Sequence, residues 1–265
     1  MSFSLDGGPV GQMDPYLFDA FYRFIHSWEA VRNETGRCLE LGSNPYFITW
    51  LLREHSNLDL TLANYFGAEF TQGQQTLSWD DGSGRREVTL DFDHFNSEQD
   101  VFPYADATFD VVVYCEIIEH LLMNPVHTLK EIHRVLRPDG VLLVSTPNVA
   151  RFENIVAIAE GKSIYDPYSG HGPYGRHNRE YSMQELIHLL KFCGFVEERC
   201  FTADAHALDL SGHPLFERAC RLARERPHDL GQYLFAVVRA SGVPQAGYPA
   251  TLFRSYPEQE LNFEW

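Results

Sequence analysis

FPYADATFDVVVYCEIIEHLLMNPVHTLKEIHRVLRPDGVLLVSTPN, residues 102–148, is the stretch that decides the fold. Within it, residues 109–115 form a β-branched and aromatic run with almost no polar side chain. Such a run predicts a strand that is buried on both faces of a parallel sheet. Glu116, Glu119 and His120 follow directly, where the chain leaves the carboxyl end of that strand. Because open α/β sheets bind their ligands at this edge, we expect a site there.

An amphipathic helix and a second strand are predicted to follow. Asn124 can cap the helix, and Pro125 suits its first position, where a missing N–H costs nothing. Apolar residues then recur at steps of three and four residues as far as Leu136, which gives the helix one apolar face. Residues 137–140 predict a turn, and residues 141–145 predict another buried strand. The stretch therefore predicts one right-handed strand–helix–strand unit of a parallel sheet.

This stretch resembles the core of class I S-adenosylmethionine-dependent methyltransferases, of the small-molecule kind called type 11. Such proteins carry PF-x-D-x-x-FD-x-V, then E-x-x-EH, and then R-x-L-x-P-x-G. The residues that match are Pro103, Tyr104, Asp106, Phe109, Asp110, Val112, Glu116, Glu119, His120, Arg134, Leu136, Pro138 and Gly140. The resemblance implies a Rossmann-like α/β fold with a seven-stranded, mostly parallel sheet, helices on both faces and an antiparallel last strand.

The chain is expected to divide into three parts: an N-terminal helical segment at 1–36, a methyltransferase domain at 37–241 with a lid insertion at 161–181, and a C-terminal tail at 242–265. The N-terminal segment holds a predicted amphipathic helix at 14–33, which Asp14 would cap. We expect this helix to pack on the sheet, and an interface in a homodimer is the alternative. In the resembled family such a helix often roofs the cofactor site.

Further elements are predicted from periodicity and from turn residues. Ser182 and Glu185 form a capping box for a helix that ends at Phe192. A hairpin at 76–90 is interpreted as a surface flap. The remaining predicted strands are 37–42, 58–64, 195–202 and 232–239, and the remaining predicted helices are 45–55 and 150–160.

The resemblance implies a loop that holds the methionine end of S-adenosylmethionine through (D/E)-x-G-x-G-x-G. Here the loop reads ELGSNPY, so the implied contacts are Glu40, Gly42, Ser43 and Asn44. Asn44 stands at the second glycine position and could adopt its positive φ. Tyr46 stands at the third and places a ring at a point of close approach.

Other implied cofactor contacts lie beyond this loop. Asn64 replaces the acid that accepts hydrogen bonds from the ribose in the family, and it would accept them without the charge. Asn96 and Glu98 are the candidates for the adenine amino group. Cys115 and Glu116 complete the expected set, at the end of the central strand.

Three roles are open for the acidic segment that follows residue 115. Methyl transfer to a hydroxyl needs a base, for which His120 is the first candidate and His177 the second, with Glu119 beside them. Alternatively, Glu116, Glu119 and His120 would share one side of a helical turn and bind a divalent metal, with His177 or His171 completing the site. E-x-x-E-H resembles the metal-binding segment of some O-methyltransferases. In many type 11 relatives, however, the same residues only order the turn.

Residues 161–181 form a long loop rich in tyrosine, arginine, histidine and glycine. A loop of this length without periodicity is usually functional or disordered, and its aromatic content argues against disorder. We interpret it as a lid over the acceptor, with an interface loop and a neutral linker as alternatives. The candidate substrate contacts are Tyr174, Arg176, His177, Arg179 and Tyr181.

Composition limits the partners and the location. The net charge of −16, from 21 basic and 37 acidic residues, disfavours a nucleic acid as the substrate. The longest apolar runs are shorter than the ~20 residues that span a membrane, and no signal peptide is evident at the N-terminus. Five cysteines without C-x-x-C spacing indicate reduced thiols and a cytoplasmic location. These are Cys38, Cys115, Cys193, Cys200 and Cys220.

Two functions are consistent with these features. The first is S-adenosylmethionine-dependent O-methylation of a small hydroxylated acceptor, such as a sugar or a glycan precursor. Such an acceptor is favoured because the lid is rich in tyrosine and arginine. Residues 172–181 also resemble a segment of methyltransferases found with surface-polysaccharide assembly, which says little about the precise acceptor. The second is a catalytically inactive binding protein that keeps the methyltransferase fold.

Overall fold

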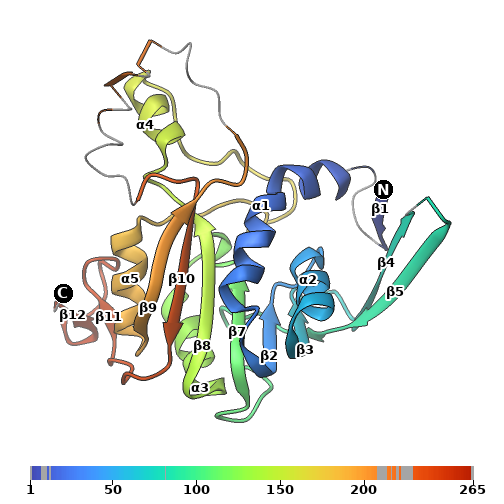
Figure 1. The fold of residues 1–265 in the computed structure, drawn as a ribbon. Coiled ribbons are helices and arrows are strands. Elements are labelled where there is room, and N and C mark those ends of the chain that lie inside the picture. The colour runs from blue at the N-terminus through green and yellow to red at the C-terminus, as the bar shows by residue number, and fades with distance from the viewer. Residues whose placement is uncertain are drawn as a thin grey trace.

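The central sheet has seven strands in the order β6-β3-β2-β7-β8-β10-β9 (Figure 1). The computed structural model describes residues 2–6, 11, 13–80, 82–207, 214–215, 217–218, 221 and 229–263. The strands are β2 (Thr35–Leu41), β3 (Asn57–Asn64), β6 (Asp93–His94), β7 (Phe109–Cys115), β8 (Leu136–Pro147), β9 (Val196–Ala203) and β10 (Tyr233–Arg239). β10, the last strand of the sheet, lies antiparallel between β8 and β9, and the neighbouring pairs from β6 to β8 are parallel. The predicted fold class is confirmed.

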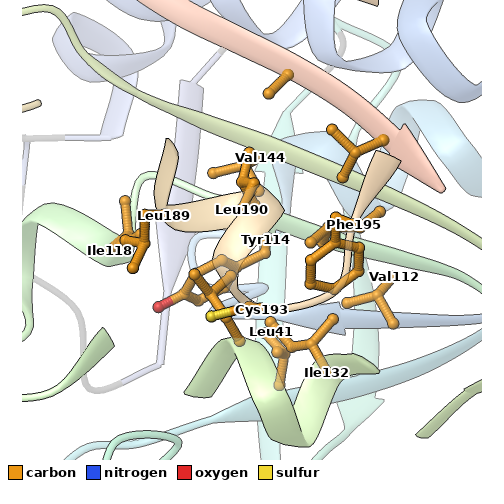
Figure 2. Packing of buried hydrophobic residues seen from close by; sticks show 14 of the residues in the cluster. Leu41, Val112, Tyr114, Ile118, Ile132, Val144, Leu189, Leu190, Cys193 and Phe195 are labelled. Atoms are coloured by element: carbon orange, nitrogen blue, oxygen red, sulfur yellow. The ribbon is translucent and has the colours of Figure 1, made fainter. Parts of the chain in front are cut away.

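Helices cover both faces of this sheet. They are α1 (Met13–Val31), α2 (Phe47–His55), α3 (Pro125–Val135), α4 (Phe152–Ala159) and α5 (Met183–Phe192). On one face, Val112 and Val144 of the strands pack with Ile132 of α3 and Leu189 of α5 (Figure 2). On the other face, alternate residues of the same strands pack with Val31 of α1 and Leu52 of α2. The two faces alternate along each strand because successive side chains point to opposite sides.

A second, three-stranded sheet lies beside the main one, in the order β1-β4-β5. β4 (Gln74–Asp80) and β5 (Arg85–Asp91) form the predicted hairpin, and β1 (Ser2–Leu5) adds an N-terminal strand that the sequence did not predict. Asp14 does not cap α1, because it is the second residue of that helix and its carboxylate accepts a hydrogen bond from the Phe3 amide at 2.7 Å. Asp14 therefore ties β1 to α1.

The predicted turn at 137–140 is absorbed into the start of β8. Phe109 pairs with Leu136 and Val111 pairs with Val141, so the intervening residues loop out of register. Asp139 has a positive φ of 63°. Pairing with β7 exists on both sides of this bulge, so β8 begins at Leu136, five residues before the predicted strand at 141–145.

The C-terminal segment packs on the outside of the α3 and α5 layer. It contains β11 (Tyr248–Pro249), a 3₁₀ turn η2 (Glu258–Glu260) and β12 (Leu261–Asn262). Tyr248, Leu252 and Phe253 contact the main core. Cys38, Cys115, Cys193 and Cys200 are free thiols, and Cys220 lies outside the described residues. Within the described part of the chain, no helix is both long enough and apolar enough to span a bilayer.

Candidate active site

A cavity of about 520 Å³ opens at the carboxyl ends of β2, β3 and β7. This is the point where the strand order reverses, the usual ligand position in open α/β sheets. Its walls come from α1, from the loops after β2 and β3, from the segment after β7 and from the lid. The lining residues are Tyr16, Arg23, Leu41, Gly42, Asn44, Pro45, Ala63, Asn64, Tyr65, Phe66, Phe95, Asn96, Ser97, Glu116, Ile117, Glu119, His120, Leu121, Tyr174 and His177.

The loop after β2 leaves the cavity free of the Tyr46 ring. Gly42 has a φ of 73°, and a Cβ there would lie 2.1 Å from Cδ1 of Ile117, so a larger residue would strain the backbone and displace that side chain. The other left-handed residue is Tyr46, with a φ of 72°, rather than Asn44 as expected. Tyr46 is 1% exposed and packs with Phe47 and other apolar residues below the loop. It is absent from the cavity lining.

Asn64 holds this loop in place. Its Oδ1 accepts a hydrogen bond from the Asn44 amide at 2.9 Å, and its Nδ2 donates to the hydroxyls of Ser43 at 2.9 Å and Tyr46 at 3.2 Å. The side chain is buried and all of these contacts lie within the protein. Asn64 lines the cavity, yet its side-chain oxygen serves the loop, which differs from the expected role toward a ribose.

Three of the implied cofactor residues lie behind the cavity wall. Glu40, Ser43 and Cys115 are buried and are absent from the lining. Burial raises the pKa of Glu40 to about 8, and the Thr49 hydroxyl donates a hydrogen bond to its carboxyl at 2.7 Å. Burial likewise raises the pKa of Cys115 to about 12. The structure therefore gives these residues a supporting position beneath the loop and the sheet edge.

Asn96 reaches the cavity, whereas Glu98 does not. Glu98 accepts hydrogen bonds from the amides of residues 122–124 and from the hydroxyl of Tyr174 at 2.9 Å. Burial alone would raise the pKa of Glu98, but these hydrogen bonds hold it below its usual value. Asn96 donates to the same Tyr174 hydroxyl at 3.1 Å. Glu98 thus fixes the lid tyrosine to the core.

Glu116 forms an ion pair with Arg23 and does not belong to the group of candidate metal ligands. Its Oε2 accepts from Nη1 of Arg23 at 2.8 Å, and its Oε1 accepts from the Ser145 hydroxyl at 2.8 Å. The predicted single helical turn is wrong, because Glu116 has a positive φ of 56° and only η1 (Ile118–His120) is helical, as a 3₁₀ turn. The left-handed conformation accompanies a contact of Glu116 with α1, and Glu116 is not part of the cluster that Glu119 and His120 form.

Glu119, His120 and His177 do come together, with one potential ligand atom from each residue lying within 4.8 Å of the others. Glu119 is fully buried, its Oε2 accepts from the Thr146 hydroxyl at 2.9 Å, and its Oε1 has no hydrogen-bond partner among the described residues. Oε1 lies 3.8 Å from Nε2 of His120. Burial and the nearby charge of Glu116 raise the pKa of Glu119 well above its usual value.

Both imidazoles are oriented through Nδ1. Nδ1 of His120 lies 3.0 Å from the carbonyl oxygen of Arg176, and Nδ1 of His177 lies 3.1 Å from Oε1 of Glu180. A carbonyl only accepts hydrogen bonds, so Nδ1 of His120 carries a proton and Nε2 of the neutral ring has a free lone pair. Burial lowers the pKa of His120, which favours that neutral form. Burial alone would raise the pKa of Glu180, yet hydrogen bonds from His177 and Arg151 lower it.

The lid contributes fewer cavity residues than expected. Tyr174 and His177 line the cavity, and Arg176, Arg179 and Tyr181 do not. Arg176 lies over the Tyr168 ring, and Arg179 pairs with Glu185 at 2.7 Å. Tyr181 is 2% exposed and belongs to the main core. His171 is exposed and is also absent from the lining, so it does not complete the histidine cluster.

Sequence reasoning missed several residues of the wall. Tyr16 and Arg23 lie seven residues apart and therefore share a face of α1, but no local pattern tells where that helix crosses the sheet edge. Tyr65 and Phe66 also line the cavity, and His94 stacks on Tyr65 with ring centroids 5.3 Å apart. The sequence signal that could have identified Tyr65 and Phe66 is their position directly after the predicted strand that ends at Asn64.

Comparisons with known proteins identify related domains and folds. The family model described as a methyltransferase domain matches residues 39–144. A "Probable S-adenosylmethionine-dependent methyltransferase" from Mycolicibacterium smegmatis is 37% identical over 110 residues, which are 41% of this chain and 36% of that protein. A protein of the same description from Mycobacterium tuberculosis is 38% identical over 96 residues, 36% of this chain and 30% of that protein. The match thus spans about a third of these relatives.

Solved structures resemble the chain over most of its length. One is a methyltransferase from Haloferax volcanii that was solved in complex with the activator Trm112. It has a TM-score of 0.55 at 18% identity, and the alignment covers 87% of this chain and 94% of that chain. A SAM-dependent methyltransferase from Thermotoga maritima has a TM-score of 0.53 at 14% identity, with 87% of this chain and 95% of that chain aligned. At these identities the likeness concerns the fold. Residues 39–144 therefore match a methyltransferase domain, and the chain has the fold of S-adenosylmethionine-dependent methyltransferases.

Proposed function

We propose that this protein methylates a hydroxyl group of a small acceptor, such as a sugar or a glycan precursor, with S-adenosylmethionine as the donor. The observation that carries the proposal is a single cavity with two different walls. The 42–46 loop forms one wall, and two oriented imidazoles, His120 and His177, form the other. A cavity of about 520 Å³ is within the usual range for sites that bind small molecules and cofactors.

The residues on the loop side suit the donor. When bound, S-adenosylmethionine would supply a methyl group on a positively charged sulfur. Gly42, Asn44 and Pro45 line the cavity while Tyr46 stays below the loop, so the space next to β2 is open. Asn96 and Tyr65 line the same cavity near the ends of β6 and β3, and in this proposal they would contact the nucleoside.

The residues on the imidazole side suit a hydroxyl acceptor. His120 would take the hydroxyl proton on Nε2, since Nδ1 already carries the proton that faces Arg176. A positioned base of this kind typically contributes ~10²–10⁴-fold. Holding the acceptor in line with the methyl group supplies the remaining effect, because it makes the step nearly unimolecular. His177, fixed by Glu180, is the second candidate for the same role.

A neutral ring is the acceptor class that these walls favour. Tyr174 and His177 present aromatic surface to the cavity, which suits stacking against a sugar or another ring. Arg176 and Arg179, the lid residues that would recognise phosphate or carboxylate, contact other parts of the lid and α5. Roles in polysaccharide synthesis and in the cytoplasm stay predictions.

A divalent metal at Glu119, His120 and His177 is the alternative way to activate the acceptor. The unpartnered Oε1 of Glu119 and two imidazoles that are held through Nδ1 fit such a donor set. A metal held there would lower the pKa of the acceptor hydroxyl. Turnover after treatment with a chelator, and after return of Mg²⁺, Mn²⁺ or Zn²⁺, separates this route from a metal-free base.

The experiment that tests the proposal measures S-adenosylhomocysteine release by mass spectrometry with a panel of sugars, nucleotide sugars and glycan fragments. We expect release only in the presence of a hydroxylated acceptor, with a mass gain of one methyl group on that acceptor. Measurable S-adenosylmethionine binding without release in any panel would favour the inactive binding protein. Methylation confined to amines would contradict the O-methylation proposal.

A further inference from the structure

A buried ion pair between Arg23 of α1 and Glu116 lies in the cavity wall. Arg23 is 6% exposed, and it donates to Glu116 at 2.8 Å and to the Tyr16 hydroxyl at 2.5 Å. The rings of Tyr16, Phe24 and Tyr233 surround the guanidinium at 5.1–5.5 Å. Because desolvating two charges offsets much of their attraction, a buried pair is weak evidence for a role in stability. Its place in a cavity points to a ligand.

Both members of the pair keep hydrogen-bonding capacity. A guanidinium has five N–H donors, and Nε of Arg23 is buried without a partner among the described residues. The carboxylate of Glu116 has about four acceptor positions and accepts from Arg23 and Ser145. Both residues line the cavity. The wall therefore offers a positive donor group next to a negative acceptor group.

The pair lies beside the loop that follows β2. The Tyr16 and Phe24 rings contact the ring of Phe47, the first residue of α2, with centroids 6.4 and 5.4 Å apart. Glu116 follows β7, which pairs along β2 up to the partners Leu41 and Tyr114. Arg23 and Glu116 therefore line the part of the cavity beside Gly42, where the loop after β2 begins.

The loop itself has no backbone donor left for a carboxylate. In this fully described segment, the amides of Gly42 and Ser43 donate to the Ala63 carbonyl at 2.8 and 3.4 Å. The Asn44 amide donates to Asn64, the Tyr46 amide donates to the Ser43 carbonyl at 2.6 Å, and Pro45 has no N–H. An anionic group placed next to the loop must find its hydrogen-bond donors elsewhere.

We propose that Arg23 and Glu116 bind the amino-acid end of S-adenosylmethionine, with Arg23 on the carboxylate and Glu116 on the ammonium group. The inference rests on the proposed function and adds a specificity-determining pair, of which Arg23 lies outside the matched domain and Glu116 lies within it. The opposite charges of the pair match the two charges of an α-amino acid, and Arg23 replaces the backbone donors that the loop lacks. Charge-assisted hydrogen bonds of this kind are roughly twice as strong as neutral ones.

Calorimetry with three ligands tests this assignment. S-adenosylhomocysteine has both charges, its decarboxylated analogue has only the ammonium group, and 5′-methylthioadenosine has neither. For Arg23→Met we expect a loss of roughly 10- to 100-fold in affinity for S-adenosylhomocysteine, with the other two ligands within about twofold of the wild type. For Glu116→Gln we expect weaker binding of the two ligands that carry the ammonium group and unchanged binding of 5′-methylthioadenosine.

Controls separate binding from folding. Arg23→Met/Glu116→Gln leaves no unpaired buried charge, and its binding of 5′-methylthioadenosine reports an intact cavity. Arg137→Met breaks the Arg137–Asp110 pair at the opposite end of β7 and should change no affinity. An equal loss for all three ligands, or an unchanged preference for S-adenosylhomocysteine, would overturn the assignment. If the wild type binds none of the three, the proposed function fails as well.

Discussion

The hydroxyl of Tyr46 donates a hydrogen bond to Oε1 of Gln75 at 2.7 Å and so ties the loop after β2 to the β4 strand of the small sheet. This contact explains how a tyrosine occupies a position at which the family has glycine. The backbone still takes the left-handed conformation, and the ring is buried and does not line the cavity. Leu5, Leu77 and Leu90 of the small sheet belong to the apolar cluster that contains Tyr46, together with residues of α1 and α2.

Tyr46→Phe should lower stability and leave cofactor binding unchanged. The variant removes the donor to Gln75 and the acceptor for Asn64, which costs about 1–3 kcal/mol in urea denaturation. The affinity for S-adenosylhomocysteine should stay within about twofold, since the ring does not line the cavity. A tenfold loss of affinity in a variant that remains folded would place Tyr46 in the binding site.

His120→Ala should reduce turnover by at least ~10²-fold with little change in S-adenosylhomocysteine affinity. The reason is that Nε2 of His120 is the free imidazole nitrogen expected to accept the hydroxyl proton. Single-turnover kinetics with the identified acceptor measure the effect. His55→Ala, at the far end of α2, is the matched control. Equal turnover in the two variants would remove His120 from the mechanism.

Glu180→Gln should lower kcat by roughly tenfold and leave KM for the acceptor nearly unchanged. Glu180 holds Nδ1 of His177 at 3.1 Å and is itself paired with Arg151, so it fixes the ring without touching the cavity. Glu180→Asp should recover part of the rate because the carboxylate is retained. Glu160→Gln breaks an exposed pair with Lys162 and serves as the control. A rise in KM alone would show that Glu180 acts only on the lid.

Glu40 should make the protein less stable as the pH rises. Burial raises its pKa from 4.5 to about 8, so the unfolded chain loses the proton first. The protonated carboxyl makes its full contribution to the free energy of unfolding below pH ~4.5. Between pH ~4.5 and pH ~8 that contribution falls by about 1.4 kcal/mol per pH unit. Denaturation curves for Glu40→Gln, set against the exposed Glu54→Gln, should show this slope removed. Parallel pH profiles for wild type and Glu40→Gln would contradict the assignment.

Patterns within single elements predicted most of the fold. Asn124 accepts the His127 amide as an N-cap, and Ser182 and Glu185 form both bonds of the predicted capping box. The buried runs became adjacent parallel strands because hydrophobic periodicity and short connections leave few other arrangements. The exceptions were β1, which pairs with a strand about 75 residues away, and the bulge at the start of β8.

The candidate site was less predictable because its contacts join distant segments. Arg23 and Glu116 are 93 residues apart, and their pairing depends on where α1 crosses the sheet. The left-handed Glu116 broke the assumed helical spacing, which is why His177 replaces it beside Glu119 and His120. Arg176 and Arg179 have the chemistry of anion binding, but neighbouring lid and helix residues take up their guanidinium groups.

A crystal structure of the complex with S-adenosylhomocysteine tests the central claim most directly. We expect the ligand in the cavity between the 42–46 loop and Glu116, its sulfur facing His120, and Tyr46 still buried against Gln75. A complex in which Tyr46 occupies the space beside Gly42, or in which the ligand lies outside this cavity, would contradict the account.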